Sequence, residues 1–241
     1  MTTMQKENIL GVPVCITDQQ SLIERIHADI AEKRQRFIVA INPEKLLKAR
    51  KDTQLKALLL KADYPIADGV GILLASRLKG GLIRERVTGI DCMQQLCRAA
   101  RARGYGVFLY GARPEIVSQA KDKLEQLYPG IRITGTLDGY VQDDEQIIQT
   151  INESKADIVF VALGSPKQEN WIERNRSRTG AFIFQGVGGS FDVLSGHLKR
   201  APDLFLKLGL EWFYRLLQQP GRIFRQFRLL GFVWLVIWGK S

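Results

Sequence analysis

Glycine residues follow short apolar segments at five places in the chain, and several of them have an acidic or polar neighbour. These places are Asp68–Gly69, Gly111, Asp138–Gly139, Gly164–Ser165 and Gly186–Val187–Gly188–Gly189. If the apolar segments are parallel strands, their carboxyl ends meet at one sheet edge, where helix N-termini offer N–H groups to phosphate and glycine lets backbone approach a ligand. The pattern favours a nucleotide or nucleotide-sugar site. No GxGxxG follows the first strand and no P-loop sequence occurs, so neither of those sites is supported. Each glycine taken alone could simply serve a tight turn.

Asp68 ends the apolar segment of YPIADGVG and is the first candidate for acid–base chemistry. A carboxylate beside a phosphate-binding edge could accept the proton of an attacking sugar hydroxyl. The alternative is a helix N-cap, because Asp is a favoured cap residue and Asp-Gly-Val-Gly could open the next helix. The local pattern by itself favours the N-cap.

The segment Ser165-Pro166-Lys167-Gln168-Glu169 predicts a helix start at the same edge. Proline is common in the first turn of a helix, and here it would place a cation, Lys167, and an amide, Gln168, near the strand ends. These side chains suit the binding of phosphate or sugar hydroxyls. A capping box fits the segment equally well, because Ser165 is followed three residues later by Gln168.

Four arginines could bind an anionic group: Arg86 in RERVTGID, and Arg215, Arg222 and Arg225 near the C-terminus. Arginine pairs bidentately with phosphate, and three such residues on a membrane-seeking segment indicate an anionic, lipid-linked ligand. Nonspecific attraction to acidic headgroups, about 1 kcal/mol per residue, is a second interpretation, and the two are compatible. Nucleic acid is not favoured, because the basic residues lie among long aliphatic side chains without an aromatic platform for single strands.

The segment 199–241 differs from the rest of the chain in charge and hydropathy. It holds eight Lys and Arg and two acidic residues, and therefore six of the ten net positive charges. Ten uncharged, mostly apolar residues, 229–238, follow its arginines, whereas a helix that spans a membrane needs about 20. The pattern predicts a basic amphipathic helix that lies in a membrane interface or docks on a partner. Burial of the same side chains between subunits would give the same pattern, which leaves a homo-oligomer open.

The residues before this segment alternate between apolar runs and amphipathic stretches, which indicates an α/β fold. The strand candidates are 37–41, 64–67, 105–110, 131–136, 158–163 and 182–187, and the helical patterns between them include 89–103, 114–128, 143–154 and 165–174. Continuous apolar runs suit strands covered on both faces, as in parallel sheets. We predict a Rossmann-like, largely parallel sheet flanked by helices in residues 1–198, followed by a C-terminal helical, membrane-associating appendage in residues 199–241.

The composition excludes several classes of protein. The 241 residues are 45% hydrophobic and 25% charged, as in an ordinary globular chain. Three cysteines are too few for a disulfide framework or a four-cysteine zinc site. His27 and His197 lie far apart and have no HExxH companion, which leaves little material for a histidine metal site or a Ser-His-Asp triad. The N-terminal residues do not resemble a signal peptide. Catalysis must therefore use carboxylates and amides, and we expect a reducing, cytosolic setting.

These residues occur in motifs that resemble those of the WecG/TagA/CpsF glycosyltransferases, which act in bacterial cell-envelope polysaccharide pathways. The motifs, in order, are INPEKL at 41–46, ADG at 67–69, RVTGID at 86–91, FLYGARPE at 108–115, DGY at 138–140, ALGSPKQE at 162–169, GVGGSFDVLSGHLKRAP at 186–202 and GLEWFYRLLQQPGR at 209–222. The resemblance runs from about Ile9 to Arg228, nearly the whole chain.

The resemblance implies an inverting, metal-independent transfer of a hexosamine-type sugar, ManNAc or ManNAcA, from a UDP donor to undecaprenyl-diphosphate-linked GlcNAc. The enzyme would be peripheral at the cytoplasmic face of the membrane and would need no cofactor, since the UDP-sugar is a substrate. No DxD motif occurs. The charge on departing UDP would therefore be met by N–H groups and basic side chains instead of a metal.

The resemblance also implies roles for individual residues. Asp68 would be the general base on the acceptor hydroxyl, which reverses the preference for an N-cap, and Gln168 and Arg86 would contribute to the catalytic site. The acceptor diphosphate would be bound by three arginines of the appendage: Arg215, Arg222 and Arg225. The donor would be bound at the strand ends by Asn42, Gly111, Asp138, Gly139, Gly164, Lys167, Gly186, Gly188 and Asp192.

One position separates this chain from part of that family. The TagA branch has a threonine where this chain has Ala40, whereas the WecG branch resembles this chain. Loss of that hydroxyl leaves UDP-ManNAc, UDP-ManNAcA and another UDP-hexose open as donors. Two other activities also stay open: a membrane-attached UDP-sugar-binding protein without transferase activity, and an α/β enzyme that acts on a soluble phosphorylated substrate.

Overall fold

Six parallel strands form the central sheet of the protein, in a computed structural model that describes residues 4–199, 201–202, 205, 214, 231–232, 234–236 and 238. The strand order is β4-β3-β8-β7-β5-β6, and every neighbouring pair is parallel. The strands are β3 (Arg36–Ile41), β4 (Tyr64–Ala67), β5 (Gly106–Gly111), β6 (Arg132–Leu137), β7 (Ile158–Ala162) and β8 (Ile183–Gly186). All six carboxyl ends therefore lie at one edge.

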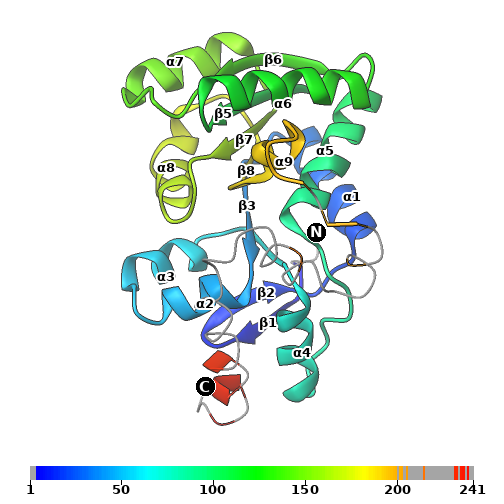
Figure 1. Ribbon diagram of the computed structural model, residues 1–241, viewed down its shortest axis with the longest axis vertical. Helices are drawn as coiled ribbons and strands as arrows, with labels where there is room; N and C mark the ends of the chain where they lie inside the picture. Colours follow the sequence, from blue (N-terminus) through cyan, green and yellow to red (C-terminus); the bar gives the residue numbers. More distant parts are fainter. Residues whose placement is uncertain are drawn as a thin grey trace.

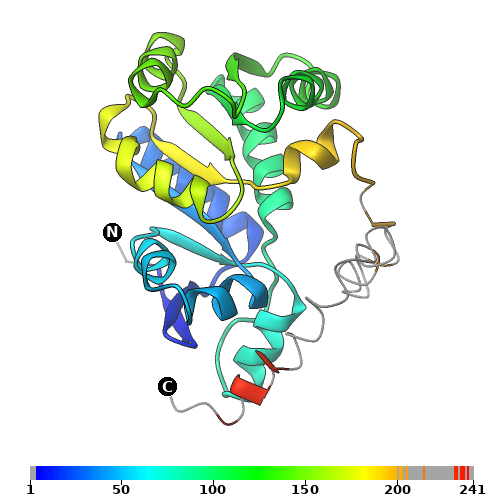
Figure 2. The same ribbon diagram turned by 60° about the vertical axis from the view of Figure 1, so that its left-hand side comes forward.

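Helices cover both faces of this sheet. One face packs against α2 (Pro43–Ala49), α3 (Thr53–Leu60), α7 (Asp144–Ser154) and α8 (Lys167–Asn175). The other packs against α1 (Gln19–Ala31), α5 (Gly89–Arg103), α6 (Pro114–Leu127) and α9 (Ser190–Leu194). Phe37 and Val39 are buried with the first group and Ile38 with the second, because successive side chains of a strand point to opposite faces. Figure 2 shows β7 and β8 between α8 on one side and α1 and α5 on the other.

The remaining elements are α4 (Val70–Leu78), the 3-10 helix η1 (Arg176–Arg178) and a hairpin of β1 (Lys6–Ile9) and β2 (Val12–Cys15). In Figure 1, β6, α6 and α7 lie at one end of the molecule, and the hairpin and α4 lie at the other. The predicted fold class is confirmed. Each of the six predicted strands and four predicted helices is present, and their ends differ from the prediction by at most two residues.

The N-terminal hairpin, which the sequence did not predict, anchors the end of α4. Its turn is formed by Leu10 and Gly11, both with positive φ, as a two-residue hairpin turn requires. From β1, the Oε2 atom of Glu7 accepts hydrogen bonds from the Ser76 hydroxyl and from the backbone N–H of Leu82, each at 2.8 Å. The hairpin therefore fixes both α4 and the loop that follows it.

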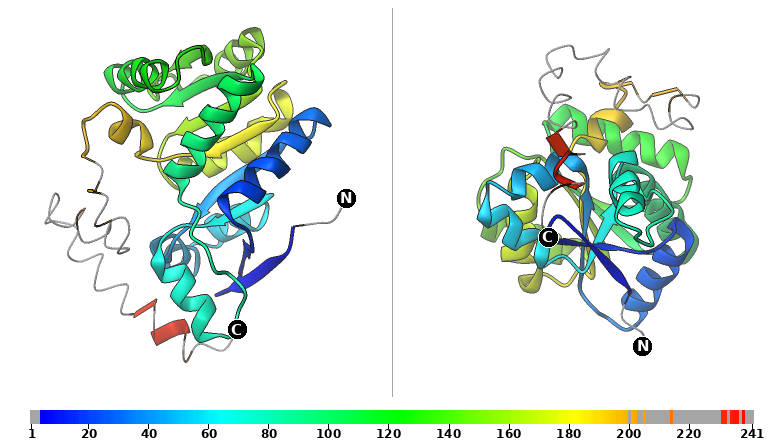
Figure 3. Two further views of the ribbon diagram at one scale, coloured as in Figure 1. Left: turned by 90° about the vertical axis from the view of Figure 1, so that its right-hand side faces the viewer. Right: turned by 90° about the horizontal axis from the view of Figure 1, so that it is seen from below.

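The described residues near the C-terminus are helical. Phe232 and Val236 are buried in the same hydrophobic cluster as the inner side of α4, whereas Trp234 and Trp238 are exposed. Figure 1 and the left-hand view of Figure 3 both place these residues beside the end of α4. Within the part of the chain that the structure describes, no helix combines the length and hydropathy needed to cross a membrane. Most of the predicted appendage, including Arg215, Arg222 and Arg225, lies outside the described residues.

Candidate active site

The carboxyl edge of the sheet brings together six residues that the sequence had singled out. Asn42 follows β3, Asp68 follows β4, Gly111 ends β5, Asp138 follows β6, Gly164 lies two residues after β7, and Gly186 ends β8. Every strand of the sheet thus contributes one of them, and the predicted placement at a single edge is confirmed. A parallel sheet is required for this, since an antiparallel neighbour would carry its end to the opposite edge.

A cavity opens at the point in the sheet where successive connections begin to run in opposite directions across it. From β5 the chain continues through α6 on one face to β6, and from β7 it continues through α8 on the other face to β8. The two helices diverge and leave a crevice between β5 and β7, the position at which doubly wound sheets bind ligands. A cavity of about 380 Å³ lies there, lined by Ala112, Arg113, Gly139, Tyr140, Ala162, Leu163, Gly164, Lys167, Gly188, Gly189 and Asp192.

Five of the predicted donor residues line this cavity, namely Gly139, Gly164, Lys167, Gly188 and Asp192. The exposed ring of Tyr140 was not among the predicted site residues, although its DGY motif had been noted. Asp138 holds the backbone of Tyr140 in place, because its Oδ1 accepts a hydrogen bond from the Tyr140 N–H at 2.8 Å. An aromatic residue directly after a strand-end Asp-Gly was the sequence signal that could have identified it.

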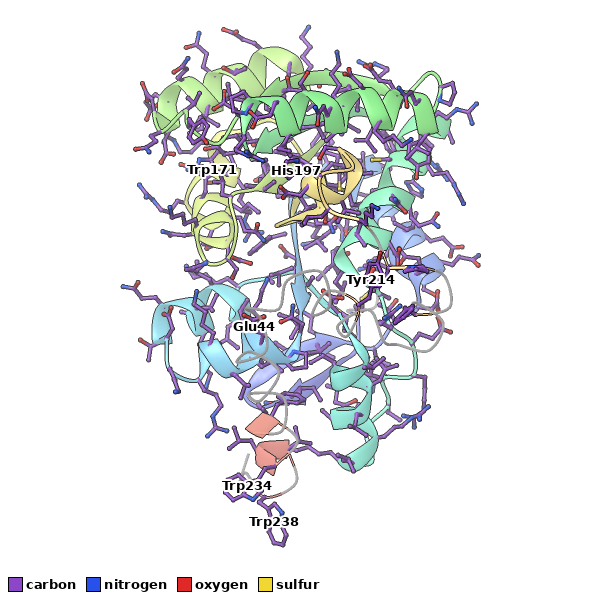
Figure 4. The ribbon with its side chains drawn as sticks, in the orientation of Figure 1. Glu44, Trp171, His197, Tyr214, Trp234 and Trp238 are labelled. Atoms are coloured by element: carbon purple, nitrogen blue, oxygen red, sulfur yellow. The ribbon has the colours of Figure 1, made fainter. Side chains whose placement is uncertain are left out.

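Arg113 is a second cation at the cavity that the sequence analysis missed. It is the N-cap residue of α6, and its Nη2 atom lies 3.0 Å from Nε2 of His197. His197 follows α9, and Figure 4 shows it beside that helix, next to the end of the molecule that carries α6 and α7. Arg113 and Lys167 thus give the cavity positive charge on both sides of the crevice.

Gln168 is buried behind the cavity and holds the glycine-rich loop after β8. Its Oε1 accepts a hydrogen bond from the N–H of Gly188 at 3.0 Å. A Cβ atom at Gly186 would lie 2.6 Å from Nε2 of Gln168, so only glycine leaves room for the amide. The capping-box interpretation is wrong: Pro166 is the N-cap residue of α8, without a side-chain capping bond, and Gln168 binds the loop instead.

An ion pair with a buried carboxylate lies next to this amide. Glu169 is fully buried, and its Oε1 lies 2.7 Å from Nζ of Lys45 and 3.3 Å from Nε2 of Gln168. Burial by itself would raise the pKa of Glu169, but the charge and hydrogen bond of Lys45 outweigh it, so the pKa lies below its ordinary value. The carboxylate is therefore ionised, and it accepts the amide N–H₂ of Gln168 while the amide oxygen faces Gly188.

Asp68 lies at the β4 end of the same edge. Its N–H donates to the carbonyl of Ile41 at 2.8 Å, and the carbonyl of Ala67 accepts from the N–H of Val87, which places Arg86 beside this end of β4. Asp68 is not the N-cap residue of α4, as the local pattern had favoured, because Gly69 occupies that position.

Ala40 lies in the neighbouring strand, β3, and Asn42 directly follows it. The side-chain oxygen of Asn42 accepts from the N–H of Lys45 at 2.9 Å and caps α2. Ala40 faces the start of α5, because a Cβ atom built at Gly89 would lie 3.2 Å from the Cβ atom of Ala40. Ala40 is not among the residues that line the cavity. A larger side chain at position 40 would press on the start of α5.

The edge has two separate parts. The cavity lies at β5 and β7, and Asp68 and Arg86 lie at β4, three strand positions from β7. At about 4.8 Å per strand the separation is roughly 14 Å, a span suited to an elongated ligand that lies along the strand ends. Among the described residues, no three His, Cys, Asp or Glu side chains are grouped to hold a metal ion.

Comparison with known proteins gives a family match over almost the entire chain. The model of the "Glycosyl transferase WecG/TagA/CpsF family" matches residues 7–241. A relative from Bacillus subtilis is 37% identical over 220 residues, which cover 91% of this chain and 86% of the relative. A relative from Bacillus spizizenii is 36% identical over 222 residues, with 92% and 86% covered. Both are named N-acetylglucosaminyldiphosphoundecaprenol N-acetyl-beta-D-mannosaminyltransferase.

Proposed function

The chain belongs to the WecG/TagA/CpsF family of glycosyltransferases, and we propose that it transfers N-acetylmannosamine from a UDP donor to undecaprenyl-diphosphate-linked N-acetylglucosamine. The observation that carries this proposal is the similarity to two mannosaminyltransferases over more than nine-tenths of the chain. The cavity at the reversal point of a parallel sheet supports it, because that is where such folds bind nucleotides.

The donor would lie along the strand ends, with its nucleotide in the cavity. The exposed ring of Tyr140 offers a stacking surface for the uracil base. Lys167, at the first turn of α8, would meet the diphosphate together with N–H groups of the loops after β7 and β8. The sugar would then extend toward β3 and β4, where Asp68 and Arg86 lie. The separation of roughly 14 Å between the two parts of the edge suits this arrangement.

The transfer step requires a base and a stabilised leaving group. The carboxylate of Asp68 takes the proton of the acceptor hydroxyl as that oxygen bonds to the anomeric carbon of the donor. The bond from this carbon to the diphosphate oxygen breaks, and UDP leaves with the electron pair from the opposite face, which inverts the anomeric configuration. Positive side chains and N–H groups of the cavity stabilise the charge on UDP, and the step requires no metal.

The acceptor would reach the enzyme at the inner surface of the cytoplasmic membrane. The relatives' names specify an undecaprenol-linked substrate, and the segment 199–241 of this chain is basic and apolar. Its arginines Arg215, Arg222 and Arg225 would bind the acceptor diphosphate. We therefore propose a peripheral attachment in which the lipid chain stays in the bilayer while the sugar enters the β4 end of the edge.

The decisive experiment offers the purified protein a short-chain analogue of undecaprenyl-diphosphate-GlcNAc in the presence of EDTA. UDP-ManNAc, UDP-ManNAcA and UDP-GlcNAc are tested one at a time, and the mass of the lipid product is measured. We expect the mass gain of one N-acetylhexosamine with UDP-ManNAc. Product from a different donor would correct the sugar, and product that needs an added divalent metal would contradict metal independence. Binding of UDP without product from any donor would support the non-catalytic alternative.

A further inference from the structure

Exposed hydrophobic side chains are concentrated at one end of the protein. Among the described residues, nine large hydrophobic side chains are exposed, and six of them belong to α4, the loop after it and the C-terminal helical residues. They are Val70, Leu74, Leu78, Leu82, Trp234 and Trp238, with exposed fractions from 40% for Val70 to 72% for Trp238. Scattered exposed hydrophobic residues are ordinary, but a contiguous group marks an interaction surface.

Helix periodicity brings three members of the group to one side of α4, and the tryptophans lie at the same end of the molecule. Val70, Leu74 and Leu78 are spaced by four residues and therefore share one side of α4, while Ile72 and Ala75 on its other side are buried. Figure 4 shows Trp234 and Trp238 projecting from the same end of the molecule at which α4 ends. We call these six residues the α4 face.

The charges around the α4 face identify its partner. Arg77, Lys79 and Arg84 are exposed beside the leucines, with Glu85 as the exposed acid in the same stretch. A second copy of the chain, related by a two-fold axis, would bring these basic groups against one another. An anionic lipid surface complements them, and leucine, tryptophan and basic side chains together are typical of elements that lie in a membrane interface.

We propose that the α4 face is a membrane-docking surface, which inserts the leucines of the catalytic domain and the tryptophans of the C-terminal appendage among anionic lipids. This inference rests on the proposed function and adds an orientation to it. Asp68 lies two residues before Val70, which is the first residue of α4 and a member of the α4 face. Docking of this face therefore places the Asp68 end of the site beside the lipid surface, where the diphosphate and the sugar of a lipid-linked acceptor lie.

The test compares two sets of exposed leucines in the full-length protein. The variant L74Q/L78Q/L82Q alters the α4 face, and the control L60Q/L127Q alters exposed leucines of α3 and α6 outside it. Each is tested for sedimentation with phosphatidylglycerol/phosphatidylcholine vesicles. Transfer is then measured to acceptor embedded in those vesicles and to the short-chain acceptor in solution. We expect the first variant to lose about tenfold in vesicle binding and in transfer to embedded acceptor, and to stay within about twofold of wild type on the soluble acceptor.

Several outcomes would overturn the inference. Equal vesicle binding by the two leucine variants would show that the α4 face does not dock on lipid. A wild-type dimer that becomes monomeric in L74Q/L78Q/L82Q, with unchanged vesicle binding, would assign the face to a second copy. If the triple variant does not fold, R77E/K79E tests the same surface, because it should weaken binding to anionic vesicles and leave binding to neutral ones unchanged. Failure of the wild type on the soluble acceptor would instead refute the proposed function.

Discussion

The ammonium of Lys45 lies 2.7 Å from the buried carboxylate of Glu169 and joins the first turns of α2 and α8. These residues are 124 positions apart in the chain, and the elements that carry them follow β3 and β7 at the candidate site. The same carboxylate oxygen accepts a hydrogen bond from Gln168, whose own oxygen holds Gly188. The pair therefore links the start of α2, after β3, to the glycine-rich loop after β8 through the amide of Gln168.

Removal of one partner of this pair should destabilise the protein more than removal of both. Glu169→Leu leaves the Lys45 ammonium, whose side chain is 10% exposed, without its counter-ion, which costs about 3 kcal/mol, the lower end of the range for a buried pair. In Lys45→Met/Glu169→Leu no charge remains, and the free energy of unfolding should return close to that of the wild type. Urea unfolding of the two variants checks this expectation. A double variant no more stable than Glu169→Leu would contradict it.

The same double variant should be stable and yet a poor enzyme. Without the carboxylate, the amide of Gln168 loses the acceptor that sets its orientation, and Gly188 loses a fixed hydrogen bond at the cavity. We expect KM for the UDP-sugar to rise about tenfold or more, which corresponds to a loss of about 1.4 kcal/mol in the free energy of donor binding. Kinetics at saturating acceptor measure this. Wild-type kinetics in a stable double variant would reduce the ion pair to a structural role.

The lowered pKa of Glu169 predicts that the stability of the protein depends on pH. Its folded pKa lies below the value of about 4.3 for an unfolded glutamate. The ionised form therefore stabilises the fold fully above that value, and the contribution is lost as the pH falls through the folded pKa. Urea midpoints measured from pH 6 to pH 3 should fall more steeply for the wild type than for Lys45→Met/Glu169→Leu. Parallel curves would show that the pair does not titrate as described.

Replacement of Asp68 by asparagine should remove the base and keep the shape. We expect kcat to fall by about 10²–10⁴-fold, the usual contribution of a general base, with unchanged thermal unfolding and UDP binding. Asp138→Asn is a useful comparison, because that side chain supports the Tyr140 turn through an oxygen that asparagine retains. Near-normal turnover in Asp68→Asn would exclude this residue as the base.

Tyr140 should contribute to donor affinity and not to the chemical step. Tyr140→Ala removes the exposed ring at the cavity and should weaken UDP binding by about 1–3 kcal/mol, or roughly five- to 150-fold. Tyr140→Phe keeps the ring and should bind UDP almost as well as the wild type. Calorimetric titration with UDP distinguishes the variants. Equal weakening in both would point to the hydroxyl group instead of stacking.

Local patterns predicted the strand ends because each one combined a buried run with a glycine or proline. YGARPE gave both the end of β5 and the start of α6 at Pro114. The capping-box hypothesis for Gln168 was wrong for a reason that local sequence does not contain. The amide finds a better partner in the Gly188 N–H, which lies 20 residues away in the chain.

Contacts between residues that are distant in the chain account for the other features that the sequence did not predict. Lys45 and Glu169 look like surface residues in sequence, and only the parallel order of β3, β8 and β7 brings them together and buries Glu169. The hairpin of β1 and β2 escaped notice because its strands have four residues each and pair across a turn at Leu10 and Gly11. Gly69 and not Asp68 caps α4, a one-residue difference that depends on a positive φ.

The anchoring of α4 by Glu7 also orders the events of biosynthesis. Glu7 leaves the ribosome early, and its last partner, Ile83, follows while the strands that complete the donor cavity are still untranslated. Gly189, at the far side of that cavity, is added roughly 100 residues later, about 5–20 s at ordinary rates of translation. The nascent chain therefore holds all the residues of the hairpin and α4 well before it can bind a nucleotide.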